Sequence, residues 1–155
     1  MNYLVSEKSK ILSLLLQHVE VTIIAIVLAI IIGIPLGIFI AHCKSLRKYV
    51  LGFINIVQAV PSMAFLGLLV PVLGIGSTPA IFMVVLYSLL PIVKNTSTGI
   101  TGIDSGILES ATGIGLTPRQ ILFKIQLPLA LPIIMAGVRI SAVSAVGLMT
   151  LSAFV

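Results

Sequence analysis

The sequence predicts an all-α integral membrane protein, a multi-span helical bundle. Three observations lead to this prediction. Mean hydropathy is +1.27. Only 8% of the residues are charged, whereas a soluble domain carries about 25%. Apolar runs that approach or exceed the roughly 20 residues needed to cross a bilayer alternate with short polar stretches. The net charge of +5 is therefore interpreted loop by loop as a topology signal, and no nucleic-acid partner is expected.

Catalytic and metal chemistry find no support in the residue pattern. Cys43 is the one cysteine, which excludes an intramolecular disulfide, and no Cys/His spacing typical of a metal site occurs. The Gly-Ile-Gly runs at residues 74–76 and 113–115 lack the lysine and Ser/Thr of a nucleotide-binding loop. We expect no catalytic residue, no metal and no cofactor on this chain.

An N-terminal segment and four spans are predicted in chain order. Residues 1–18 form an extracellular or interfacial segment, for which a short interfacial helix and a disordered start both stay open. Residues 19–155 form the transmembrane domain. Its spans are expected at about residues 19–41, 49–73, 80–93 and 129–155, with a polar stretch at about residues 94–128. Gly33, Pro35 and Gly37 are expected to kink the first span.

Basic residues predict the orientation of these spans. Cytoplasmic loops carry an excess of Lys and Arg. One orientation leaves only Lys8 and Lys10 outside, and places in the cytoplasm Lys44, Arg47, Lys48, Lys94, Arg119 and Lys124. We therefore expect the N-terminus outside and residues 94–128 in the cytoplasm.

The first half of the polar stretch is predicted to be a short helix. Asp104 or Ser105 can cap its start, because a short side-chain oxygen accepts a bond from a free backbone N–H. Gly113 and Gly115 are expected to end it, since glycine readily adopts the left-handed conformation that closes a helix.

A second short helix is predicted to follow the glycine turn. Thr117 serves as its N-cap and Pro118 as its first residue. Pro128 is expected to stop the run. A polar helix–turn–helix between membrane spans is typical of a docking surface.

The same stretch carries a family signature. Glu109-Ser110-Ala111, then Gly115, then Ile125-Gln126-Leu127-Pro128 resembles the "EAA" signature of permease subunits in bacterial binding-protein-dependent ABC importers. Ser110 stands where that family most often has alanine. The resemblance implies the type I ABC importer permease fold with a cytoplasmic coupling helix, which docks on an ATPase subunit. The residues to which it assigns ATPase coupling are Glu109, Ser110, Ala111, Gly115, Ile125, Leu127 and Pro128.

Two further stretches, Asn55–Gly76 and Leu86–Asp104, resemble importers of glycine betaine, carnitine, choline and related osmoprotectants. This resemblance implies a multi-pass subunit of a bacterial cell membrane that is not itself an enzyme. ATP and Mg belong to partner ATPase subunits. The other implied partners are a second permease copy or sister permease, and an extracellular solute-binding protein or fused binding domain. Permeases of this family continue with a further span, so the chain is expected to be truncated before its last span.

Polar residues inside the spans are the remaining candidates. Gln58, Pro61 and Ser62 interrupt the second span, where they line a translocation path or gate, or else form a structural kink; both interpretations stay open. Arg139 in the fourth span is predicted to be an intramembrane structural charge.

A stand-alone channel or ion-coupled secondary transporter is the alternative function. It would be expected to place ionisable residues along its spans. Arg139 has no intramembrane Asp or Glu partner in the sequence, which weighs against this alternative.

Overall fold

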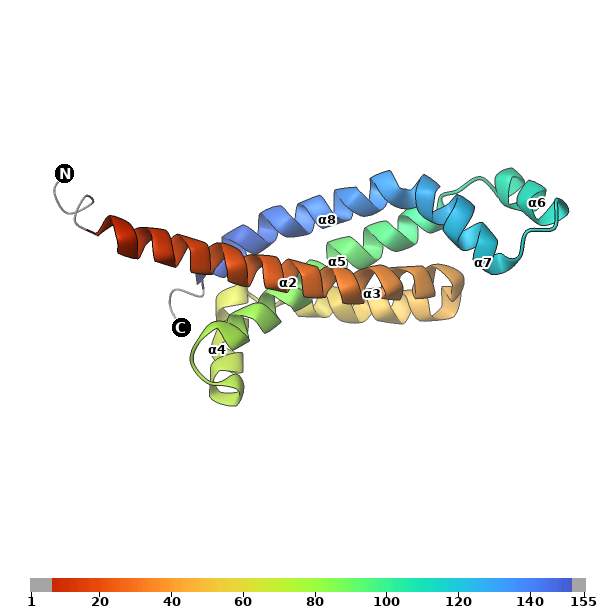
Figure 1. The fold of residues 1–155 in the computed structure, drawn as a ribbon. Helices are drawn as coiled ribbons and strands as arrows, with labels where there is room; N and C mark the ends of the chain where they lie inside the picture. Colours follow the sequence, from red (N-terminus) through yellow and green to blue (C-terminus); the bar gives the residue numbers. More distant parts are fainter. Residues whose placement is uncertain (1–6, 152–155) are drawn as a thin grey trace.

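The computed structural model describes residues 7–151, and all regular structure among them is helical. In the bundle, α2, α5 and α8 lie alongside one another, α3 flanks them, and α6 and α7 form a hairpin beyond one end (Figure 1). The first residues of α2 and the last residues of α8 lie near the opposite end. The elements are α2 (Lys8–His42), α3 (Lys44–Ala59), α4 (Ser62–Leu73), α5 (Ser77–Thr101), α6 (Ser105–Gly113), α7 (Pro118–Ile121), the π-helical turn η1 (Leu122–Gln126) and α8 (Leu127–Thr150).

Three helical segments of the described chain are long and apolar enough to cross a membrane. They are α2, α5 and the continuous segment Pro118–Thr150, which joins α7, η1 and α8. Their outer faces stay apolar: Leu16, Ile23 and Ile31 of α2 are exposed. A soluble helix would carry polar residues there, so these faces suit a lipid environment.

The predicted second span differs from the structure. Helices α3 and α4 meet at a bend of 94°, so residues 49–73 form a corner instead of a straight span. Pro61 lies at the corner and disfavours a helical conformation in the residue before it. Val60 accordingly adopts an extended conformation, with φ −73° and ψ 131°.

Helix boundaries correct the sequence prediction at two further places. Helix α2 begins at Lys8, so residues 8–18 continue the first long helix; residues 1–6 lie outside the described part. Helix α5 continues to Thr101, so residues 94–101 belong to it and not to the polar loop. Thr96, Ser97 and Ile100 are buried, because the inward-facing stripe of α5 continues past Lys94.

Pro128 does not end the helix, contrary to the prediction. It lies in the first turn of α8, directly after η1. In this π turn the Leu127 N–H bonds to the Leu122 carbonyl, five residues earlier. Proline has no N–H for the usual bond to the carbonyl four residues earlier. The five-residue spacing of the π turn lets the helix continue through this point. The chain therefore passes from hairpin to span as one helical segment.

Helix α5 is held closely from two sides by small residues. A Cβ added at Gly37 of α2 would lie 2.5 Å from Thr96 Cβ, and one at Gly33 would lie 2.8 Å from Ile92 Cγ2. A Cβ at Gly137 of α8 would lie 2.7 Å from the Pro91 carbonyl oxygen. Small residues at helix interfaces permit such close packing in membranes. The buried stripe of α2 recurs every fourth residue, at Ala25, Ala29, Gly33, Gly37 and Ala41.

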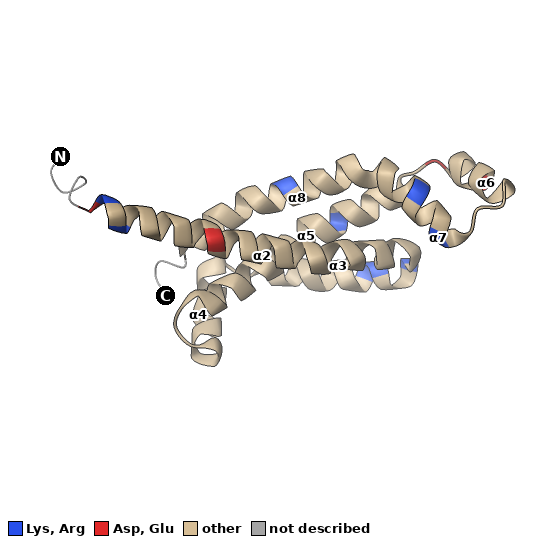
Figure 2. Cartoon of the chain, viewed as in Figure 1, with Lys and Arg blue, Asp and Glu red and all other residues tan. Residues whose placement is uncertain are grey.

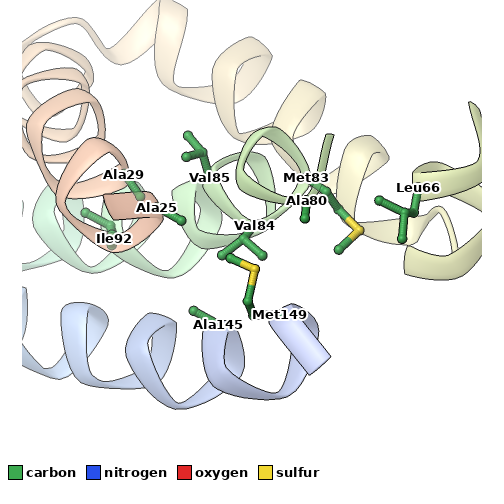
Figure 3. Packing of buried hydrophobic residues seen from close by; sticks show 10 residues of the cluster. All are labelled: Ala25, Ala29, Leu66, Ala80, Met83, Val84, Val85, Ile92, Ala145 and Met149. Carbon is green, nitrogen blue, oxygen red and sulfur yellow. The ribbon is translucent and has the colours of Figure 1, made fainter. Parts of the chain in front are cut away.

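The largest apolar cluster is also centred on α5 (Figure 3). Met83 points toward Leu66 of α4, and Val84 lies beside Met149 of α8. The other buried members are Ala25, Ala29, Ala80, Val85, Ile92 and Ala145. One central helix therefore ties together the other long elements.

A Gly37→Ala substitution tests this close approach. We expect it to lower the free energy of unfolding by about 1–3 kcal/mol, as overpacking does, because the new methyl group overlaps Thr96. Gly67→Ala in α4 is the matched control, since nothing lies within 4 Å of its Cβ position. There the better helix former should raise stability by up to about 1 kcal/mol. Thermal unfolding in detergent measures both variants, and equal shifts of the same sign would contradict the packing argument.

Candidate functional site

The α6–α7 hairpin begins each of its helices with a side-chain cap. The Gly106 N–H donates to Asp104 Oδ1 at 2.7 Å. At the second helix, the Gln120 N–H donates to Thr117 Oγ1 at 3.4 Å, and the Thr117 N–H donates to Gln120 Oε1 at 2.9 Å. This reciprocal pair is a capping box, followed by Pro118 as the first helical residue. Both predicted helix starts are confirmed.

Gly115 closes α6 in the left-handed conformation, with φ +84°. Its N–H donates to the Thr112 carbonyl at 2.9 Å, and the Leu116 N–H donates to the Ala111 carbonyl at 3.1 Å. The predicted glycine closure is confirmed for Gly115, whereas Gly113 is the last residue of α6 and has no positive φ. Because other residues are strained at this φ, Gly115 fixes the direction in which the chain leaves α6.

The residues of the family signature divide between the hairpin and its base. Glu109, Ser110 and Gly115 are exposed on the hairpin, whereas Ala111 is only 3% exposed. The remaining signature residues lie on η1 and the start of α8: Ile125 and Leu127 are half-buried, and Pro128 is exposed.

Apolar side chains lie exposed near the signature residues. Ile107 is 44% exposed, Ile114 is 78% exposed and Phe123 is 66% exposed. Single apolar residues on a surface are normal, but Ile107 and Ile114, on and directly after the helix that carries Glu109, suit contact with another protein. Phe123 lies between Gly115 and Ile125 but is not itself a signature residue, so the sequence pattern did not identify it.

Gln58 satisfies a backbone carbonyl that a proline leaves free. Pro91 has no N–H to donate to the Tyr87 carbonyl four residues earlier. The Gln58 side-chain amide donates to that carbonyl instead, at 2.8 Å. In return, the Tyr87 hydroxyl donates to the Val60 carbonyl, directly before Pro61. These bonds tie the α3–α4 corner to α5.

Pro61 and Ser62 form this corner. The Pro61 carbonyl accepts the first bond of α4, from the Phe65 N–H at 2.9 Å. The structure therefore brings Pro61 and Ser62 to the helix start.

A cleft of about 740 Å³ lies between α3, α5 and α8. It is lined by Gln58, Tyr87, Leu90, Pro91, Lys94, Asn95, Thr98, Ile140, Ser144 and Leu148. Of the three predicted path residues, Gln58 lines it and Pro61 and Ser62 do not. Lys94 and Asn95 had been assigned to the polar loop. The signal that could have placed them in the cleft is their helical spacing from Tyr87.

Basic residues gather at the hairpin end and also occur part-way along α5 and α8 (Figure 2). Lys94 is therefore not a loop residue, which corrects its use as a topology marker. Arg139 is exposed on α8, whereas Gly137 and Ser141 on the opposite face are buried against α5. Within residues 7–151, no hydrogen bond or ion pair involves Arg139.

Comparison with protein families gives one clear match. Residues 33–155 match the family described as the inner membrane component of binding-protein-dependent transport systems.

Curated relatives agree with this match. The chain is 45% identical, over 139 residues, to a glycine betaine/carnitine/choline transport system permease protein of Bacillus subtilis (strain 168), covering 90% of this chain and 64% of the relative. It is 41% identical to a choline transport system permease protein of the same organism, with the same coverage. It is 40% identical to an osmoprotectant import permease protein of Salmonella typhimurium, covering 99% of this chain and 74% of the relative.

A solved structure shows the same fold. Inward-facing conformations of the MetNI methionine ABC transporter match with a TM-score of 0.73 at 24% identity, over 84% of this chain and 67% of that chain. The predicted fold, a helical bundle of the ABC importer permease kind, is confirmed.

The link between Gln58 and Pro91 can be tested by combining two substitutions. Gln58→Leu should lower the free energy of unfolding by about 1–3 kcal/mol, because the Tyr87 carbonyl loses its donor. Pro91→Ala restores a backbone N–H that can donate to that carbonyl. In the Pro91→Ala background, Gln58→Leu should therefore lower the free energy of unfolding by clearly less. Thermal unfolding of the four proteins gives the coupling energy. An equal cost in both backgrounds would show that Gln58 does not replace the missing donor.

Proposed function

The chain belongs to the family of inner membrane components of binding-protein-dependent transport systems, and on that premise we propose that it is the permease subunit of an ATP-driven importer. The α6–α7 hairpin carries this proposal. It projects beyond the bundle with the EAA-like signature (Figure 1). The stand-alone channel or carrier is not favoured, because the relatives are named as transport system permeases.

The hairpin is proposed to dock on an ATPase subunit, which supplies the ATP and Mg. Glu109 and the exposed apolar side chains Ile107 and Ile114 form the contact surface. Closure of the paired ATPases moves the hairpin. The segment Pro118–Thr150 is helical throughout and conveys this movement into the bundle, so that the α3–α5–α8 cleft opens alternately to the two sides.

The hairpin end is proposed to face the cytoplasm. The Arg47 guanidinium donates to Thr101 Oγ1 at 3.5 Å, which ties the basic start of α3 to the end of α5. With Lys94 removed from the count, that end still carries Lys44, Arg47, Lys48, Arg119 and Lys124. The opposite end has Lys8 and Lys10, and the positive-inside tendency supports an N-terminus on the outside.

The transported solute is proposed to be a quaternary ammonium osmoprotectant such as glycine betaine, carnitine or choline, which the names of the relatives support. The chain has no Trp, the aromatic residue that binds cations best, and 3 Tyr. Initial selection is therefore assigned to an extracellular binding protein or fused domain. The chain spans 64% of its Bacillus relatives, and we propose that the whole permease pairs with a second copy or a sister subunit.

Gly115→Val, expressed with the ATPase subunits of the same organism, tests the docking proposal. A β-branched residue strains the left-handed conformation by about 1–2 kcal/mol, so the ATPase that co-purifies with the full-length permease should fall about tenfold. ATP-driven uptake should fall with it, while membrane insertion is unchanged.

Gly113→Val is the matched control, since neither glycine has an atom within 4 Å of its Cβ position and only Gly115 has a positive φ. Normal uptake and full ATPase retention by Gly115→Val would refute the role of this turn. A wild-type permease that inserts but retains no ATPase would refute the proposed function.

A further inference from the structure

The α3–α5–α8 cleft is lined by hydrogen-bond donors and a positive charge, and no acidic residue lines it. The Lys94 ammonium has three donors and no acceptor. The Gln58 amide donates to the Tyr87 carbonyl at 2.8 Å, and the Asn95 amide donates to the Pro91 carbonyl at 2.7 Å. Each amide nitrogen carries a second N–H. Thr98 and Ser144, each with a hydroxyl group, line the same cleft. This set of groups complements an anion.

Lys94 occupies an exposed position part-way along α5 and lines the cleft. It is seven residues before the end of α5, and its neighbour Asn95 lies against Gly137, where an added Cβ would be 2.8 Å from Asn95 Cβ. Gly137 is ten residues into α8, or about 15 Å at 1.5 Å per residue. Helix α5 is long and apolar enough to cross a membrane, and a charged residue within such a helix that lines a cleft is a candidate functional residue. Among residues 7–151 no carboxylate forms an ion pair with Lys94.

We propose that this cleft binds the carboxylate of a zwitterionic solute in transit. Lys94 is its ionic partner, and the amides of Gln58 and Asn95 are additional donors. Tyr87 lies seven residues before Lys94 on the same face of α5, about 10 Å along the axis. Its ring provides a surface suited to a methylated ammonium group.

This site rests on the proposed function. It distinguishes the proposed solutes by whether they carry a carboxylate. Glycine betaine and carnitine carry a carboxylate and a quaternary ammonium group, whereas choline carries the ammonium group with a hydroxyl. Lys94 attracts the carboxylate of the zwitterions and repels the uncompensated charge of choline. The permease itself therefore favours carboxylate-bearing solutes, in addition to any selection by the binding protein.

The experiment measures initial uptake of glycine betaine and of choline by the full-length permease, assembled with its ATPases and binding protein in proteoliposomes. The ratio of the two rates is compared between wild type and Lys94→Gln. Because the ATPase and binding protein are unchanged, their contributions cancel in this comparison. We expect the betaine-to-choline ratio to fall at least about tenfold in Lys94→Gln, since a charged hydrogen-bonding partner is lost. Lys94→Arg should retain most of the ratio.

Two further variants complete the design. Arg139→Gln removes a charge from an exposed position on α8 outside the cleft and should leave the ratio unchanged. Thr98→Glu, at an exposed cleft position one turn from Lys94, places a competing carboxylate beside the ammonium and should lower the ratio. Thr98→Glu still tests the carboxylate site if Lys94→Gln fails to accumulate in the membrane.

The outcomes separate the two proposals. If Lys94→Gln and Thr98→Glu leave the ratio unchanged, or slow both solutes equally, the carboxylate site is overturned while the permease function stands. If the assembled wild-type complex imports neither solute, the proposed function fails and the site fails with it.

Discussion

The backbone-to-backbone approach of α2 and α8 to α5 is the constraint on which the rest of the structure depends. In a bilayer, apolar side chains gain little by leaving lipid for protein, so helices associate through close packing and hydrogen bonds. Gly33 and Gly37 provide the close approach on one side of α5, and Gly137 provides it on the other. These contacts fix α5 over residues 89–96, and Pro91 and Asn95, which lie against Gly137, also line the cleft.

Prolines shape this same bundle by freeing backbone carbonyls that the membrane interior cannot hydrate. Pro91 frees the Tyr87 carbonyl, and the corner at Pro61 leaves that of Val60 without a helical partner. Both are satisfied across the α3–α5 interface, by the Gln58 amide and the Tyr87 hydroxyl. Gln58 was open to two interpretations, as a path residue and as part of a structural kink. Its amide forms a structural bond to the Tyr87 carbonyl, and its side chain also lines the cleft, so its place in a translocation path stays a prediction.

The sequence predicted best what depends on local chemistry. The caps at Asp104 and Thr117 and the left-handed Gly115 follow from neighbouring residues, and all three are confirmed. The 94° corner and the continuation of α5 past Lys94 could not be predicted in the same way. Hydropathy ends a span at the first charged residue, but the end of a helix depends on tertiary burial, here of Thr96 and Ser97.

The helix continues through Pro128, and this continuity connects the hairpin to the helices that line the cleft. A helix broken at this proline would have separated the hairpin from the span by a flexible joint. Instead, η1 absorbs the proline, and the segment remains helical from Pro118 to Thr150. Within this segment, the buried Gln126 and Ala130 lie around the start of α8, and Ala130 packs against Gly99 of α5. A displacement of the hairpin must therefore act first on the α5–α8 contact, beside which Lys94 and Asn95 line the cleft.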